Sequence, residues 1–202
     1  MNRTCFTPPA DPVPGNTAEQ IFRLYGVIVE DPRREGITPQ AVRSALFAAG
    51  GHVTIFLNSP GGSCVAASQI YTMLMEYRRI GSVTIKIDGA AISAASVVAM
   101  AGTEVIMSPT AIMMIHNPIT SVSGGCGDMG NAMERLRETK EGLITAYELK
   151  TGLPRAEISR LMDASTWMNA RKAVALGFAD GILGVRPGTE LPGLAAVPLL
   201  PD

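Results

Sequence analysis

The sequence has few charged residues, few aromatic residues and few cysteines for its length. Only 17% of its 202 residues are Asp, Glu, Lys or Arg, and the formal net charge is −1. A chain this close to neutral offers no electrostatic attraction to nucleic acid or to an anionic membrane surface. Its three cysteines, Cys5, Cys64 and Cys126, are too widely spaced to predict a metal site. They indicate free thiols in a reducing, cytoplasmic compartment.

Long hydrophobic runs are also missing. A membrane-spanning helix needs roughly 18 or more uncharged apolar residues, and Lys86 and Asp88 interrupt the best candidate. The N-terminal stretch MNRTCFTPPADPVPGN lacks the apolar centre of a signal peptide. We therefore expect no contact with membrane or nucleic acid, no metal and no cofactor.

What the sequence does have is a high apolar content. Hydrophobic residues make up 47% of the chain, which predicts one well-packed α/β domain and allows further apolar surface to be buried in an assembly. We expect a flexible lead-in over residues 1–18, the domain over residues 19–185, and a disordered Pro/Gly-rich tail over residues 186–202.

Hydrophobic periodicity, glycines and capping residues give the order of the elements. Strands are predicted at residues 21–29, 52–57, 83–87, 104–107 and 111–115, and helices at residues 38–49, 63–77, 90–102, 131–151, 154–162 and 170–176. Gly89 is predicted to form a sharp turn before the third helix. The glycine-rich stretch 120–130 is predicted to be mobile, and the charged residues of the long helix after it to form a solvated face.

Two successive strand–loop–helix units are the most informative pattern. The first strand runs into NSPGGS, where a proline and two glycines let backbone N–H groups point into a cleft. The second unit places Ser93 in the first turn of its helix, and His116 ends a following strand. Loops of this kind meet at one edge of a parallel sheet, where a histidine can act as the base for a serine nucleophile. Taken singly, each side chain is more often structural, so the prediction depends on their combination.

Four ordered stretches, FLNSPGGS, GAAISAASVVAMAG, MMIHNP and ARKAVALGFADGI, resemble the ClpP family of serine peptidases, especially its phage and prophage members. The resemblance covers roughly residues 20–185 and implies a ClpP/crotonase-type spiral of ββα units, with a protruding handle over about residues 119–151. It also implies a homo-oligomer, commonly heptameric rings stacked into a tetradecamer, that hydrolyses polypeptide inside a chamber.

Carried over by motif, the resemblance makes Ser93 the nucleophile and His116 the base. The backbone amides of Gly62 and Ala94 take the oxyanion-hole positions. The third triad member is where the sequence departs from the family, because Ser165 stands where an acidic residue is usual. Asp163, two residues earlier, is the nearest carboxylate, and the Ser165 hydroxyl is the alternative.

The resemblance to phage enzymes implies maturation of capsid or scaffold protein. The N-terminus does not match the axial loop of the ATPase-dependent enzymes, so the sequence gives no support to dependence on an AAA+ unfoldase.

Three alternatives to a serine peptidase stay open. They are a crotonase-type acyl-CoA enzyme, a membrane-associated Ser-Lys signal-peptide peptidase, and an inactive ring-forming protein, the last suggested by Ser165.

Overall fold

The structure is a computed structural model, and it describes residues 6–7 and 20–186. Within these residues the strands form one mixed sheet in the order β1-β2-β3-β4-β5-β8, with β6 beside β4 and β7 beside β6. The strands are β1 (Phe6–Thr7), β2 (Gln20–Tyr25), β3 (His52–Ser59), β4 (Ser82–Ile92), β5 (Glu104–Met107), β6 (Ile112–Ile115), β7 (Thr166–Asn169) and β8 (Gly181–Ile182). Among the strand pairs of the described residues, β1–β2 and β6–β7 are antiparallel and the others are parallel. The predicted α/β class is therefore confirmed.

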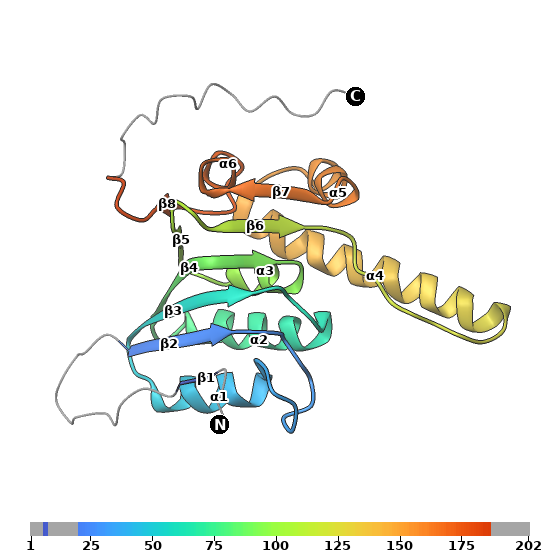
Figure 1. The fold of residues 1–202 in the computed structure, drawn as a ribbon, viewed down its shortest axis with the longest axis horizontal. Helices are drawn as coiled ribbons and strands as arrows, with labels where there is room; N and C mark the ends of the chain where they lie inside the picture. The colour runs from blue at the N-terminus through green and yellow to red at the C-terminus, as the bar shows by residue number, and fades with distance from the viewer. Residues whose placement is uncertain (1–5, 8–19, 187–202) are drawn as a thin grey trace.

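The helices are α1 (Pro39–Ala48), α2 (Cys64–Tyr77), α3 (Ala94–Ala99), α4 (Cys126–Thr151), α5 (Arg155–Asp163) and α6 (Ala170–Ala175). Figure 1 shows α1, α2 and α3 against one face of the sheet, with α4 extending past the ends of the strands. Side-chain caps fix where three of these helices begin, because Thr38, Ser63 and Asn169 each accept a hydrogen bond from an amide in the first turn. These boundaries match the predictions closely.

The predicted turn at Gly89 is wrong. Strand β4 continues through it to Ile92, and the helix begins only at Ala94. The register between β3 and β4 shifts here, and the Asn58 side chain fills the irregularity by accepting a hydrogen bond from the Ala90 amide at 3.1 Å. A Cβ on Gly89 would lie 2.5 Å from the Asn58 Oδ1 atom. The glycine is required for close packing inside a strand rather than for a turn.

Helix α4 differs from the prediction in where it begins and in what its charged side chains contact. It starts at Cys126, inside the stretch predicted to be mobile, and Asp128 closes the first turn by accepting from the Gly125 amide at 2.8 Å. Its second half packs on the core through Leu143, Ile144 and Tyr147, which are buried.

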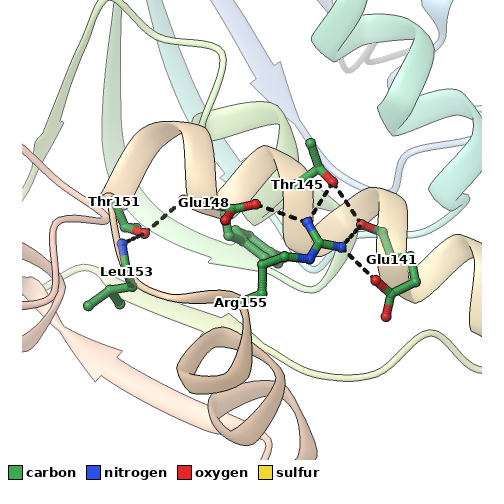
Figure 2. A network of polar contacts seen from close by, with 7 residues as sticks. Glu141, Thr145, Glu148, Thr151, Leu153 and Arg155 are labelled. Atoms are coloured by element: carbon green, nitrogen blue, oxygen red, sulfur yellow. Dashed lines mark hydrogen bonds and ion pairs between the residues drawn. The ribbon is translucent and has the colours of Figure 1, made fainter.

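The charged face of α4 is not simply solvated, and that prediction is wrong in part. Arg155, at the start of α5, donates to the Glu148 carboxylate at 2.9 Å and to the Glu141 carboxylate at 2.5 Å. Figure 2 shows this guanidinium reaching along α4, where it also donates to the Thr145 hydroxyl. The contacts fix α5 against the second half of α4.

The predictions for the two ends of the chain concern residues 1–18 and 186–202. Apart from Phe6–Thr7 and Arg186, these lie outside the described residues. Within the described residues, no helix combines the length and the apolar character that crossing a membrane demands.

Candidate active site

Strands β4 and β6 bring Ser93 and His116 to the same edge of the sheet. The two strands are parallel, and Ile92 is in register with Met114. Ser93 is the first residue after β4, and His116 is the first residue after β6. The His116 Nε2 atom lies 2.7 Å from the Ser93 Oγ atom, which is hydrogen-bonding distance.

The backbone of Ser93 is held in an unusual conformation. Its φ of 57° and ψ of −127° lie in a region that residues with a side chain rarely adopt. The Ser93 amide donates to the Met114 carbonyl oxygen at 2.9 Å, and all six residues of α3 are buried. Such a conformation persists only where the surrounding structure fixes it, and it is typical of functional turns.

The glycine loop after β3 lies directly against this turn. A Cβ on Gly61 would lie 2.6 Å from the Ile92 carbonyl oxygen and 2.9 Å from the Ser93 Cβ atom. Two backbone hydrogen bonds to Ile28 hold the loop in place. The Ile28 amide donates to the Gly61 carbonyl oxygen at 2.8 Å, and the Ile28 carbonyl oxygen accepts from the Ser63 amide at 2.9 Å. Only a residue without a side chain fits so close to Ser93.

Two backbone amides at this edge have no partner in the described part of the chain. They are the amide of Gly62, in the glycine loop, and the amide of Ala94, the first residue of α3. The Ala94 nitrogen lies 3.0 Å from the position of a Cβ on Gly61, so the loop and the start of α3 adjoin. Unpaired amides beside a hydroxyl are donors for a negatively charged oxygen.

Asp163 ends α5 near the histidine, but its hydrogen bonds go to other residues. One carboxylate oxygen, Oδ1, accepts from the Lys140 ammonium at 2.6 Å and from the Asn117 side-chain amide at 2.8 Å. These two hydrogen bonds, Lys140 first, hold the pKa of the Asp163 carboxyl below its ordinary value. The structure places no hydrogen bond between Asp163 and His116 within the described residues.

Ser165 directly precedes β7. Strands β6 and β7 are antiparallel, and the last pair of their ladder is Ile115 with Thr166, the neighbours of His116 and Ser165 along the chain. Ser165 has a φ of 48° and an exposed side chain. Within the described residues, neither residue considered for the third position has a hydrogen bond to His116.

Sequence reasoning missed Lys140 and Asn117 as neighbours of this site. Asn117 follows His116 directly in the MMIHNP stretch, so the sequence could have indicated that it lies near the site. Lys140 comes from α4 and was assigned to the solvated face. No feature of the sequence alone indicates that its side chain reaches α5, because that contact depends on how two helices pack.

The chemistry that this edge can perform follows from the groups present. A serine hydroxyl, an imidazole within hydrogen-bonding distance and unpaired amides are the parts of a nucleophilic acyl-transfer site. Among the described residues there is no cluster of His, Cys, Asp and Glu side chains that could hold a metal ion.

Comparison with known proteins gives the same family throughout. The family model described as Clp protease matches residues 17–186. An ATP-dependent Clp protease proteolytic subunit of Porphyromonas gingivalis is 35% identical over 136 residues, which is 66% of this chain and 60% of the relative. Proteolytic subunit 3 of Streptomyces avermitilis is 28% identical over 93% of this chain and 88% of its own length. Proteolytic subunit 2 of Thermobifida fusca is 28% identical over 89% of this chain and 90% of its own length. The family match spans strands β2 to β8, the glycine loop and the Ser93–His116 pair, and the chain belongs to the Clp protease family.

Proposed function

We propose that the chain is a serine endopeptidase in which Ser93 is the nucleophile and His116 the general base. The observation that carries this proposal is the 2.7 Å contact between the Ser93 Oγ and His116 Nε2 atoms. His116 takes the proton as Oγ attacks a peptide carbonyl carbon, and the imidazolium then protonates the leaving amine. A water molecule, deprotonated by the same imidazole, hydrolyses the resulting ester and frees Ser93.

The Gly62 and Ala94 amides would stabilise the negative charge on the carbonyl oxygen during both attacks. Support comes from their position beside the Ser93 turn and from the lack of any other acceptor within the described residues. Removing one such donor in a serine hydrolase typically costs about 10²–10³ in rate.

For the third position we propose Asp163, acting when Lys140 releases it. Its low pKa keeps the carboxylate charged at neutral pH, which is the form that orients and stabilises an imidazolium. The Lys140 ammonium, 2.6 Å from Oδ1, competes for the same oxygen. The Ser165 hydroxyl is the alternative, because Ser165 precedes Thr166, which pairs with the residue before His116.

Three single variants separate these possibilities when Ser93 labelling by a fluorophosphonate is timed at pH 7.5. Asp163→Asn is expected to slow labelling by about tenfold or more, because the imidazolium loses its charged partner. Lys140→Met is expected to speed labelling, because the carboxylate is freed. Ser165→Ala is expected to label like the wild type. Slow labelling only in Ser165→Ala would instead assign the orienting role to the serine.

We further propose that the chain assembles into a homo-oligomer, as a heptameric ring or a stacked pair of rings, through the projecting half of α4. Support comes from Met129 and Met133, near the start of α4, which are 40% and 55% exposed. Figure 1 shows one end of α4 extending beyond the sheet. Exposed apolar side chains on a projecting helix favour burial against another subunit.

Native mass spectrometry tests this assembly. The wild type is expected to give a multiple of the 21.2 kDa chain, and Met133→Glu to shift the distribution to smaller species, because a buried unpaired charge opposes association. The matched control is Ile80→Glu, since Ile80 is 76% exposed and follows α2 at the opposite edge of the sheet. A monomeric wild type, or equal effects of the two variants, would contradict a role for α4.

The substrate that we propose is a capsid or scaffold polypeptide, cut in the cytoplasm during phage or prophage assembly. What supports this is the resemblance of the four sequence motifs to phage-type members. The relatives reported above are ATP-dependent subunits by name, so degradation of an unfolded polypeptide should be assayed both alone and with an AAA+ unfoldase and ATP.

A second candidate is a catalytically weak or inactive ring protein with a structural role. The observation that favours it is the pairing of Asp163 with Lys140 and Asn117 rather than with the imidazole. An assembled protein that neither hydrolyses peptides nor reacts with the fluorophosphonate would support this candidate.

A further inference from the structure

The strained turn at Ser93 is held from both of its sides. On the amino side, the Ser93 amide donates to the Met114 carbonyl oxygen on β6. On the carboxyl side, the Ser93 carbonyl oxygen accepts twice from Ser96, from its amide at 2.9 Å and from its hydroxyl at 2.6 Å. Ser96 thus fixes the peptide that joins Ser93 to the unpaired Ala94 amide.

The hydroxyl of Ser96 has a second partner on a different helix. Its Oγ atom lies 2.8 Å from the Tyr147 Oη atom, and Tyr147 belongs to α4. A carbonyl oxygen can only accept, so the single Ser96 hydroxyl hydrogen is used toward Ser93. The tyrosine hydroxyl must then be the donor to Ser96. The result is a directed chain of hydrogen bonds from α4 through α3 to the backbone of Ser93.

Both hydroxyl groups are shielded from water. Ser96 is 0% exposed and Tyr147 is 1% exposed, and the Tyr147 ring packs on Phe178 with centroids 5.6 Å apart. Burial raises the pKa of the Tyr147 hydroxyl above its ordinary value, so the hydroxyl stays protonated and remains a donor. With no water to replace a lost partner, removing the Ser96 hydroxyl leaves the Tyr147 donor unsatisfied, and removing the Tyr147 hydroxyl takes away the donor that orients and polarises the Ser96 hydroxyl.

We propose that Ser96 and Tyr147 are positioning residues, which hold the Ser93 turn in its reactive conformation. Through them, that conformation depends on how α4 packs against α3. This inference rests on the proposed function, because it assigns the pair a role in the reactivity of Ser93. Neither side chain touches substrate in this account. They act through the Ser93 carbonyl, whose orientation sets where the Ser93 hydroxyl and the Ala94 amide point.

The alternative for the same pair is a purely structural one, in which two buried hydroxyls satisfy each other and contribute only to stability. The two accounts differ in what a conservative change does to the chemical step. Tyr147→Phe keeps the ring and its packing and removes one hydroxyl. Tyr77→Phe is the matched control, because Tyr77 is 5% exposed and donates to the Gly51 carbonyl oxygen at 3.3 Å, at the opposite edge of the sheet.

The experiment measures fluorophosphonate labelling of the full chain at several probe concentrations, which separates the maximal rate of labelling from the half-saturating probe concentration. In Tyr147→Phe the maximal rate is expected to fall about tenfold, as for the loss of one hydrogen bond of ordinary net strength, while the half-saturating concentration is unchanged. Ser96→Ala is expected to lower the rate at least as much. The double variant is expected to be no slower than Ser96→Ala, because the tyrosine acts through the serine.

Thermal melting of each variant measures stability, which is the property that a purely structural role would change. If Tyr147→Phe melts earlier, as Tyr77→Phe does, yet labels at the wild-type rate, the positioning role is overturned. If Tyr147→Phe does not fold, Ser96→Ala decides by the same comparison. A wild type that is not labelled at all overturns the proposed function, and the role of the pair in it, so the two failures are told apart by the wild-type result.

Discussion

Ser93→Ala is expected to abolish peptide hydrolysis, with a loss of about 10⁴-fold or more, and to remove covalent labelling entirely. The reason is that no other hydroxyl within the described residues is hydrogen-bonded to His116. His116→Gln is expected to cost about as much, because nucleophile and base act as one unit and removing either disables both. Peptide hydrolysis at saturating substrate measures both losses.

The fold of these variants is expected to be intact. Within the described residues, the hydrogen bond of the Ser93 side chain is the one to His116, and the backbone contacts of Ser93 to Met114 and Ser96 survive the change to alanine. Thermal melting within a few degrees of the wild type is the control. Hydrolysis by Ser93→Ala at the wild-type rate would contradict the assignment and indicate a different nucleophile.

Gly61→Ala is expected to damage both the stability and the site. The residue has a φ of +93°, and a Cβ there would meet the Ile92 carbonyl oxygen at 2.6 Å and the Ala94 nitrogen at 3.0 Å. Backbone strain of about 1–3 kcal/mol and overpacking of similar size predict a loss of roughly 3 kcal/mol in the free energy of unfolding. Because the neighbours that must move belong to the Ser93 turn, labelling should also slow by more than about tenfold.

Gly50→Ala is the matched control for this change. A Cβ on Gly50 would have no atom within 4 Å, so neither the free energy of unfolding nor the labelling rate should change appreciably. Urea denaturation and probe labelling, both measured at a temperature where all forms are folded, provide the comparison. Equal behaviour of the two alanine variants would show that the glycine loop does not set the geometry of the nucleophile.

Local patterns in the sequence were enough to predict most of the elements and their order. The caps at Thr38, Ser63 and Asn169 act within one turn of helix, so the residues that fix each boundary are neighbours along the chain. The nearness of Ser93 and His116 could also be anticipated, because the carboxyl ends of parallel strands share an edge.

The errors arose where a distant side chain decides the local structure. Gly89 lies inside a strand because Asn58, from another strand, occupies the space beside it and binds the Ala90 amide. Strand β7 carried no predicted element, and it forms because β6 provides an antiparallel partner. Neither outcome is encoded in the residues next to the affected position.

The surroundings of His116 could not be predicted for the same reason. Which group reaches Asp163 depends on the placement of α4 against α5, and that placement depends on contacts such as those of Arg155. The hydrogen bond between Tyr147 and Ser96 could not be predicted either, because a tyrosine on the apolar face of a helix is expected to be a core residue. The sequence indicates that Ser93 and His116 lie together, and the packing of α4 determines which groups surround them.

The most direct test of the Ser93–His116 assignment is peptide mapping by mass spectrometry after the assembled wild type has reacted with a fluorophosphonate. The expected result is one adduct, on the peptide that contains Ser93, which is absent when His116 is replaced by glutamine. An adduct on another residue, or a fully assembled protein that carries no adduct, would contradict it.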